Sequence, residues 1–149
     1  MTDVVDVLLT GPVRDEMRSA AAAAAPKETG GLLLGWWDGP GVVVRHAVEV
    51  PDRRATRASW TRRPRVARRV LRQALDEFDH PLLGYVGDWH AHPVVCAVSS
   101  RDVDSIVETS SQYDGALVLL VQLPDGSIDV RAAQSGRRRV ARLNAGDAA

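Results

Sequence analysis

The sequence predicts a single domain of the α/β or α+β class, in which helices pack on a mixed β-sheet. Short β-branched runs alternate with segments rich in helix-forming residues, and two pairs of these runs flank turn-forming residues, as in hairpins. This order of elements is typical of a mixed sheet flanked by helices. The length of 149 residues suits one domain, and neither an internal repeat nor an interdomain linker is visible.

The first half of the chain is expected to contain a strand, a helix and a hairpin. Val4–Leu9 is apolar and β-branched, which is typical of a strand. Pro12–Ala25 is rich in strong helix formers, and Pro26 should end that helix. We interpret its alanine run as a tightly packed helix face. Gly31–Trp37 and Val42–Val50 flank an Asp-Gly-Pro-Gly turn and predict an antiparallel hairpin.

The middle of the chain predicts a loop, a helix and a strand. Residues 51–63 are polar and arginine-rich without clear periodicity, so we expect a loop. Pro64–Phe78 has apolar residues spaced for one helix face, and its other face is basic. Leu82–Trp89 should form the next strand. The basic face consists of Arg65, Arg68, Arg69 and Arg72.

The last part predicts a helix over Arg101–Gln112 and a hairpin formed by Ala116–Leu123 and Ile128–Ala133. From Ser135 the chain is basic and then small and polar, which favours a frayed end. We therefore expect a domain over residues 1–136 and a flexible C-terminal tail over residues 137–149.

Composition excludes several classes of protein. Lys and Arg number 19 and so do Asp and Glu, so the net charge is zero and gives no overall attraction to nucleic acid. Cys96 is the single cysteine, which excludes an internal disulfide and a metal cage built only from cysteines. Because neither a signal peptide nor a membrane-length apolar run is visible, we expect a cytoplasmic protein without membrane or nucleic-acid partners.

Two histidines close together suggest a metal site. His90 and His92 lie two positions apart at the end of a predicted strand, so their side chains share one face and could chelate one divalent ion. Pro93 should stop the strand directly after them. A pair of unrelated histidines at a strand end is the alternative interpretation.

A catalytic zinc site needs a third protein ligand, an open position for water and a general base. Asp102 is a candidate ligand, although Ser99 and Asp102 also have the spacing of a helix capping box. The two interpretations are compatible, because a helix start can aim a carboxylate at a neighbouring strand end. Glu28 precedes a predicted strand that starts with paired glycines, which allow close approach of backbone or substrate, and it is a candidate base. A surface glutamate after a helix is the alternative.

Together these segments resemble the JAMM motif of the JAB/MPN metalloprotease family, in its prokaryotic Mov34/MPN/PAD-1-like members. The segments are Glu28 in E-T-G-G-L-L-L-G, His90-Ala91-His92-Pro93 and Ser99-x-x-Asp102, and the resemblance covers nearly the whole chain. It implies a single MPN/JAB-type domain whose sheet and helices are layered as in cytidine deaminases.

The resemblance implies a role for each motif residue. His90, His92 and Asp102 would bind Zn2+, with water in the fourth position. Glu28 would act as the general base, and Ser99 would donate a hydrogen bond to the developing oxyanion. Family members with the intact motif hydrolyse peptide or isopeptide bonds after the C-terminal Gly-Gly of ubiquitin-like proteins, and some bacterial relatives process sulfur-carrier proteins. One alternative function is a narrower enzyme that releases an amino acid or a small adduct from a sulfur-carrier protein. The other is a non-catalytic MPN scaffold.

This sequence departs from the family pattern in one loop. His92 and Asp102 are ten positions apart, one fewer than is usual in the family, and the missing position falls between Pro93 and Ser99. Cys96 in that loop is an alternative zinc ligand, although a small buried thiol is its commoner use. Asp88 shares the face of His90 and is either a hydrogen-bond partner for a ligating imidazole or a solvated carboxylate.

Substrate recognition should rely on short elements. Eukaryotic deubiquitinating members of the family that this sequence resembles carry insertions that grip ubiquitin. The corresponding loops here, at 51–63 and 93–100, are short, so the resemblance implies no extensive binding of ubiquitin chains. A groove beside the strand that follows Glu28 could take an extended Gly-Gly tail by strand addition. Trp36, Trp37 and Trp60 could line its rim, although we expect at least one of them to lie in the core. The basic helix face or the arginines at 137–139 could contact a folded modifier, or could simply be solvated. The oligomeric state does not follow from the sequence.

Overall fold

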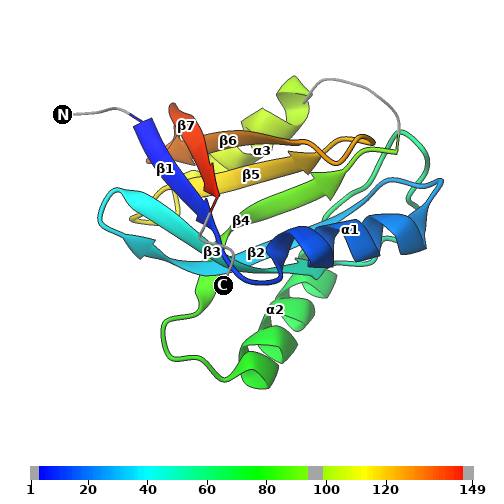
Figure 1. Cartoon of the computed structure of the whole chain (residues 1–149), viewed down its shortest axis with the longest axis horizontal. Coiled ribbons are helices and arrows are strands. Elements are labelled where there is room, and N and C mark those ends of the chain that lie inside the picture. Colours follow the sequence, from blue (N-terminus) through cyan, green and yellow to red (C-terminus); the bar gives the residue numbers. More distant parts are fainter. Residues whose placement is uncertain (1–3, 94–98, 146–149) are drawn as a thin grey trace.

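The computed structural model describes residues 4–93 and 99–145, which form one α+β domain (Figure 1). Seven strands and three helices occur in this part of the chain. In chain order they are β1 (Val4–Leu9), α1 (Val13–Ala24), β2 (Thr29–Asp38), β3 (Gly41–Glu49), α2 (Pro64–Phe78), β4 (Gly84–Ala91), α3 (Ser100–Ser110), β5 (Leu117–Gln122), β6 (Ile128–Gln134) and β7 (Arg137–Ala145).

The strands form one mixed sheet in the order β1-β3-β2-β4-β5-β6-β7, and pairing of β7 with β1 closes it into a barrel. The pairs β1–β3, β4–β5 and β7–β1 are parallel, and the other pairs are antiparallel. The predicted mixed sheet with flanking helices is confirmed. Closure into a barrel was not predicted, because it depends on pairing between the two ends of the described chain.

The prediction of a flexible tail is wrong for residues 137–145. They form β7, which lies between β6 and β1 and packs Ala141 and Leu143 on the core. The basic run at 137–139 misled the prediction, although one face of β7 is simply solvated and carries Arg138 and Arg142 in ion pairs. The backbone edges of β1 and β6 provide hydrogen-bond partners that composition does not reveal. Residues 146–149 lie outside the described residues.

The locally encoded elements are confirmed. Helix α2 has the predicted bounds, both predicted hairpins form, and α1 ends before Pro26. The interpretation of the alanine run as a packed face holds only in part, since Ala20 and Ala21 contact the core whereas Ala22 and Ala23 are exposed. None of the helices in the described ranges is long and apolar enough to cross a membrane.

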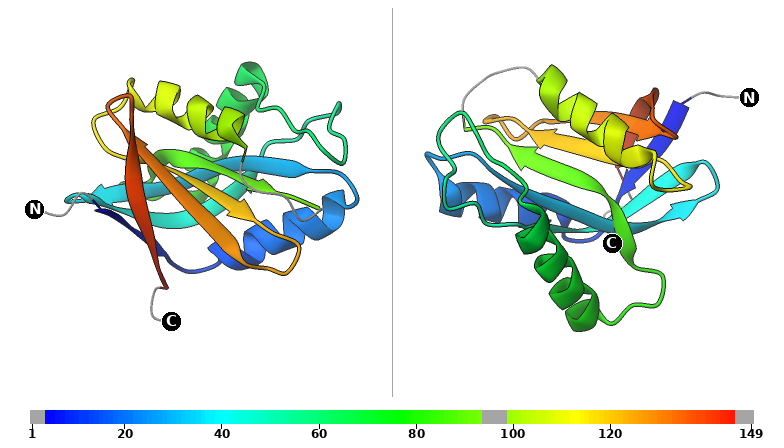
Figure 2. Two further views of the ribbon diagram at one scale, coloured as in Figure 1. Left: turned by 90° about the horizontal axis from the view of Figure 1, so that it is seen from above. Right: turned by 180° about the vertical axis from the view of Figure 1, so that it is seen from behind.

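The sheet is buried on two sides. The barrel interior holds one hydrophobic core, to which α1 contributes Val13 and Met17. A second core lies between the outer surface of β2 and β5 and the inner faces of α2 and α3 (Figure 2). Strands β2, β4 and β5 are therefore buried on both faces, which explains their continuous apolar runs. Polar side chains within such strands must be paired or functional.

Removal of β7 should destabilise the domain. A chain that ends at Gly136 would leave the edges of β1 and β6 unpaired and expose the core beneath Leu143. We expect a lower midpoint of thermal unfolding, by about 2–4 °C for each kcal/mol lost, together with aggregation. A chain that ends at Ala145 keeps β7 and is the control. Equal midpoints for the two chains, measured by circular dichroism, would contradict the role of β7 in closing the barrel.

Candidate metal centre

Pairing of β2 with β4 brings the separated motif residues together. Thr29 lies opposite Ala91 and Gly30 lies opposite His90, so Glu28 lies beside the end of β4. On the other side of β4 the ladder with β5 continues past the strand end, since the His92 amide donates to the Gln122 carbonyl. Both histidines are thus held by a strand that has partners on both edges.

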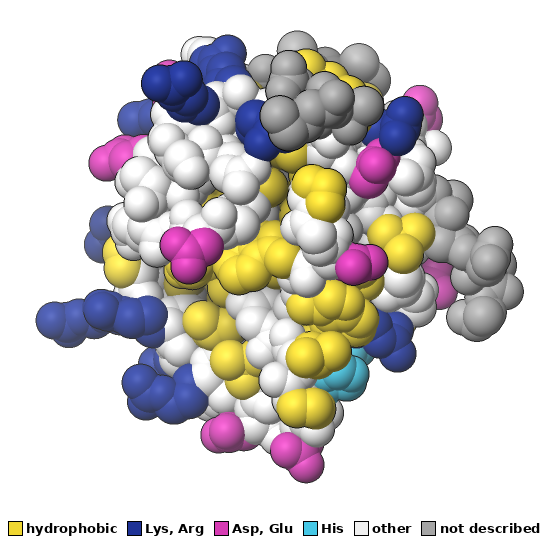
Figure 3. Space-filling view, turned by 90° about the vertical axis from the view of Figure 1, so that its left-hand side faces the viewer, with side chains coloured by type: hydrophobic (Ala, Val, Ile, Leu, Met, Phe, Trp, Pro, Cys, Tyr) yellow, Lys and Arg dark blue, Asp and Glu magenta, His cyan; other side chains and the backbone are white. Residues whose placement is uncertain are grey.

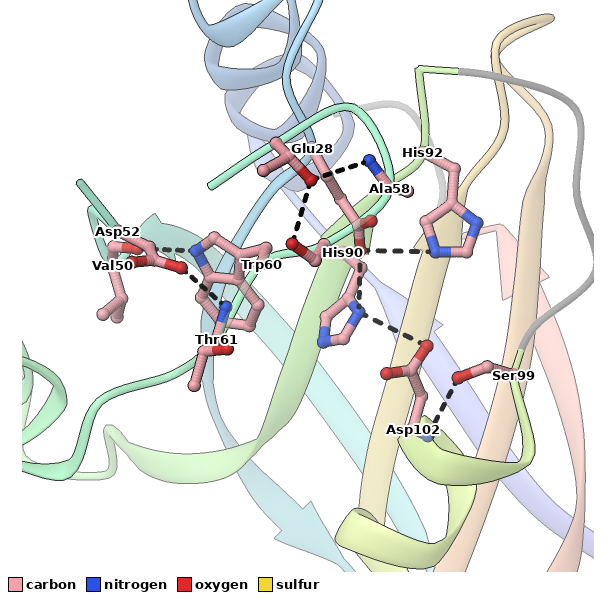
Figure 4. A network of polar contacts seen from close by, with 12 residues as sticks. Glu28, Val50, Asp52, Ala58, Trp60, Thr61, His90, His92, Ser99 and Asp102 are labelled. Carbon is pink, nitrogen blue, oxygen red and sulfur yellow. Dashed lines mark hydrogen bonds and ion pairs between the residues drawn. The ribbon is translucent and has the colours of Figure 1, made fainter. Parts of the chain in front are cut away.

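Four side chains converge at this point. Glu28 Oε1 lies 3.7 Å from His90 Nδ1 and 3.6 Å from His92 Nε2. His90 Nδ1 also lies 3.6 Å from Asp102 Oδ2, at the start of α3. Figure 4 shows the side chains of His90, His92 and Asp102 directed toward one another. Ligands about 2.0–2.1 Å from a tetrahedral zinc ion are themselves about 3.4 Å apart, so these spacings suit a shared ion.

The hydrogen bonding of the cluster also fits a metal ion. Only 8% of Glu28, 8% of His90 and 7% of His92 is exposed, yet His90 Nδ1 has no hydrogen-bond partner. Buried polar atoms in proteins are almost always hydrogen-bonded. The unbonded His90 nitrogen therefore indicates that a group from outside the chain, such as a metal ion, is its partner. Two imidazoles with a carboxylate form a common catalytic zinc set. Ligand atoms of Glu28, His90 and His92 lie within 4.8 Å of one another, so either Glu28 or Asp102 could be the third ligand.

Burial changes the acidity of the cluster. Desolvation raises the pKa of Glu28 from 4.5 to about 7, and the charge of Asp102 adds to the rise. Desolvation lowers the pKa of His90 from 6.5 to about 4, assisted by His92 and Arg62 and opposed by Asp102. His90 is therefore neutral at pH 7 without a metal, which is the form that binds metal. A carboxyl group with a pKa near 7 is suited to accept and return protons.

Ser99 caps helix α3. Its Oγ accepts a hydrogen bond of 3.1 Å from the Asp102 amide, so the serine half of the predicted capping box is confirmed. The same helix start directs the Asp102 carboxylate at His90. Ser99 is exposed, and its hydroxyl can still donate a hydrogen bond. Cys96 and the rest of the shortened loop at 94–98 lie outside the described residues.

The loop at 51–63 forms one wall of the site, and of its residues the sequence indicated only Trp60, as one of three tryptophans at the rim of a groove. The edge of the Trp60 ring meets His90, with 4.9 Å between ring centroids, and Trp60 Nε1 donates to the Val50 carbonyl. The Thr56 carbonyl accepts a 2.7 Å hydrogen bond from the Glu28 amide. This loop therefore contacts both a histidine and the acid of the cluster. Its lack of periodicity concealed this role.

Asp52 organises the same loop. Its carboxylate accepts hydrogen bonds from the Arg54 and Thr61 amides and from Arg63 Nε. Burial acts to raise the pKa of Asp52, but these hydrogen bonds outweigh it and the net pKa is lowered. One carboxylate thus ties three points of the loop and holds Trp60 in place.

The other expectations for this region need correction. Trp36 and Trp37 do not line the site; they lie at the far end of β2, where Trp36 stacks on His80 and Trp37 donates to the Ala116 carbonyl. Figure 3 views this end of the molecule, on which hydrophobic side chains gather. Strand addition beside β2 is also excluded, since β3 and β4 occupy its two edges.

Gly30 allows neighbouring protein groups to pack closely against the start of β2. A Cβ at Gly30 would lie 2.5 Å from the Trp89 carbonyl oxygen and 3.0 Å from the Trp60 ring. Of the two uses considered for these glycines, close approach of neighbouring protein groups is the one observed. A side chain here would push Trp60 away from His90.

Asp88 has partners other than those expected. It is buried and accepts hydrogen bonds from Arg62 at 2.9 Å and from the Tyr85 hydroxyl at 3.0 Å. The interpretation as a solvated carboxylate is therefore wrong, and the contacts found are with a guanidinium and a phenol in place of an imidazole. Burial raises the pKa of Asp88, although Arg62 opposes the rise. Through Arg62, Asp88 fastens the 51–63 loop to β4.

Two surface pockets give access to the cluster. One of about 530 Å³ has His92, Lys27 and Arg57 in its wall. The other, of about 360 Å³, is bordered by Glu28 and Trp60. Both pockets also have Pro26 and Lys27 in their walls, so the cluster borders a surface hollow on each side of this segment.

Comparison with known proteins now identifies the family. Residues 10–133 match the family described as prokaryotic homologs of the JAB domain. The chain belongs to this family.

The solution structure of protein DSY2949 from Desulfitobacterium hafniense resembles this JAB domain with a TM-score of 0.64 and 18% identity, over 94% of each chain. At that identity the similarity establishes the fold alone. No curated protein matches the chain.

Replacing Glu28 should change how stability depends on pH. In the metal-free protein, between pH 4.5 and about 7, the folded state keeps a proton on Glu28 that the unfolded chain has released, so rising pH destabilises the fold. Glu28→Gln lacks this effect. We expect its free energy of unfolding, relative to wild type, to rise across that window and then level off, as measured by urea unfolding with a chelator. The exposed residue Glu77 provides the control Glu77→Gln, and the same rise in that variant would contradict the assignment.

Removing Asp88 should destabilise the site wall. Asp88→Ala leaves the Tyr85 hydroxyl without its acceptor and leaves the Arg62 guanidinium with the Tyr85 oxygen as its one remaining acceptor, and we expect a loss of about 1–3 kcal/mol in the free energy of unfolding. Asp88→Asn keeps an acceptor and should lose less. Asp129→Ala removes a surface pair with Arg131 and should lose at most about 1 kcal/mol. Equal losses for Asp88→Ala and Asp129→Ala in denaturant titrations would show that the buried network is not structural.

Proposed function

We propose that this JAB domain is a zinc-dependent hydrolase that cleaves the peptide or isopeptide bond after the C-terminal Gly-Gly of a ubiquitin-like or sulfur-carrier protein. The observation that carries the proposal is the buried, unbonded His90 Nδ1 within 3.7 Å of the Glu28 and Asp102 carboxylates. We place the activity in the cytoplasm, because a chain with a single cysteine forms no internal disulfide and so suits a reducing compartment.

His90, His92 and Asp102 would hold the ion in this proposal. The first two are imidazole nitrogen donors at the end of β4, and Asp102 supplies a carboxylate oxygen from α3. When bound, zinc supplies Lewis-acid chemistry that makes water acidic near pH 7 and polarises a carbonyl group. The rigid strand end and the helix cap keep the three donors in place without a bound ligand.

In this proposal Glu28 would transfer protons, and Ser99 would stabilise the negative charge that develops on the carbonyl oxygen. With a pKa near 7, the Glu28 carboxylate can take a proton from the attacking water and return it to the leaving amine. The hydrogen bond from the Glu28 amide to Thr56 fixes the backbone from which this side chain extends. The exposed Ser99 hydroxyl can donate to the carbonyl oxygen as it gains charge.

The access routes favour a narrow substrate. The two pockets flank the cluster, one beside His92 and the other beside Glu28, and a Gly-Gly segment has no side chains that would hinder its entry into either pocket. Since β3 and β4 are paired with the two edges of β2 next to the site, the tail would be held by pocket contacts. The flanking pockets thus support cleavage at the end of a tail.

Metal content and activity should separate the roles of the motif residues. Purified protein should hold about one zinc per chain, and His92→Ala should lose it. Glu28→Gln should keep zinc while the hydrolysis of a fluorogenic peptide ending in Gly-Gly-amide falls by about 10²–10⁴-fold. The measurements are elemental analysis and initial rates, with His80→Ala at the far end of the domain as a control.

The outcomes discriminate among the alternatives. Loss of zinc in Glu28→Gln would make Glu28 a ligand, in agreement with the Glu28, His90 and His92 cluster. Wild-type protein that takes up zinc but cleaves no Gly-Gly substrate would support a non-catalytic scaffold. Protein that takes up no zinc would refute the proposal.

A further inference from the structure

Positive charge is concentrated next to the candidate site. Nine of the 19 basic residues lie within residues 53–72, and that segment contains no acidic residue. Because the whole chain is neutral, the rest of it is correspondingly acidic. The segment consists of the loop that contacts Glu28 and His90 and the first part of α2, which follows it directly.

Most of this charge has no structural partner. Arg62 pairs with Asp88, and Arg63 pairs with Asp52. Within the described ranges, the other arginines of the segment are exposed and their side chains make neither an ion pair nor a hydrogen bond. These seven, named here the arginine surface, are Arg53, Arg54, Arg57, Arg65, Arg68, Arg69 and Arg72.

The charges on α2 oppose the stability of their own helix. Arg65 and Arg69 are four residues apart, as are Arg68 and Arg72, and such like-charge pairs on one helix face repel each other and destabilise the helix. The first turn of α2 has no acid to complement the helix dipole, whereas the first turn of α1 has two. Charges that are unfavourable for the fold indicate a role in binding.

The chemistry of the surface selects the kind of partner. Its apolar neighbours on α2 face the core, so no hydrophobic face remains for insertion into a membrane. Trp60 is the one aromatic residue within 53–72 and is buried, so no ring is available to stack on nucleic-acid bases. Exposed guanidinium groups without aromatic neighbours suit carboxylates, which they can bind through paired hydrogen bonds.

We propose that the arginine surface docks the acidic face of the protein whose Gly-Gly tail enters the hydrolase site. This inference rests on the proposed function. Arg57 lies in the wall of the pocket beside His92, so the surface extends from α2 to the mouth of the site. Electrostatic attraction at this surface would steer an acidic partner toward the cluster. Because the whole chain has no net charge, such attraction depends on a local concentration of positive charge.

The test measures binding without hydrolysis. The probes are a labelled polyglutamate peptide ending in Gly-Gly, its polyglutamine counterpart and a labelled DNA duplex, followed by fluorescence anisotropy with the full chain in the presence of a chelator. We expect binding of the polyglutamate peptide alone, weakened by salt. Arg65→Glu with Arg69→Glu should weaken it by about tenfold or more.

Helix α1 supplies a matched control. Arg14 and Arg18 are also four residues apart and exposed, and Arg14, like Arg65, is the second residue of its helix. Arg14→Glu with Arg18→Glu should leave the affinity nearly unchanged. The α2 variant should remain folded by circular dichroism, since it removes a repulsion and adds acid to a first turn.

Three results would overturn the proposal: no binding of the acidic peptide by wild type, equal weakening by the two double variants, or tighter binding of the duplex than of the peptide. Since binding is measured without metal, a chain that fails to hydrolyse Gly-Gly substrates would refute the proposed function and leave this result intact.

Discussion

The antiparallel register between β2 and β4 is the constraint on which the site depends. It places Thr29 opposite Ala91, and thereby sets Glu28 beside two histidines that lie more than sixty positions away in the chain. A shift of one residue would turn His90 into the barrel interior and bring Trp89 out of it. Gly30 and its neighbour Gly31 allow the backbone packing that fixes this register. The rigidity of the centre is thus a property of the sheet.

Burial of polar groups at this strand end is unfavourable for the metal-free fold. Glu28 holds a proton to about pH 7, His90 resists protonation to about pH 4, and one imidazole nitrogen is unbonded. Such perturbed groups gather at functional sites because a ligand or a reaction uses them. The surrounding barrel and the Asp88–Arg62 contact supply the stability that maintains the arrangement.

The 51–63 loop links the chemistry of the centre to the surface of the domain. Its inward side holds Trp60 against His90 and is ordered by Asp52, while its outward side carries unpaired arginines that continue onto α2. One short segment could therefore shape the centre and meet a partner. A small domain without large insertions has few other elements that could combine these tasks.

Local signals in the sequence determined much of this protein. Turn residues between β-branched runs specify both hairpins, helical periodicity specifies α2 over Pro64–Phe78, and the spacing of His90 and His92 places two imidazoles on one face, because each depends only on neighbouring residues. Tertiary structure alone decided that β7 closes the barrel, that Asp88 pairs with Arg62, and that Trp60 rather than Trp36 or Trp37 borders the site. These outcomes depend on which strand edges and buried charges remain unpaired after distant segments have packed together. Local sequence patterns cannot predict them, because they reflect only neighbouring residues.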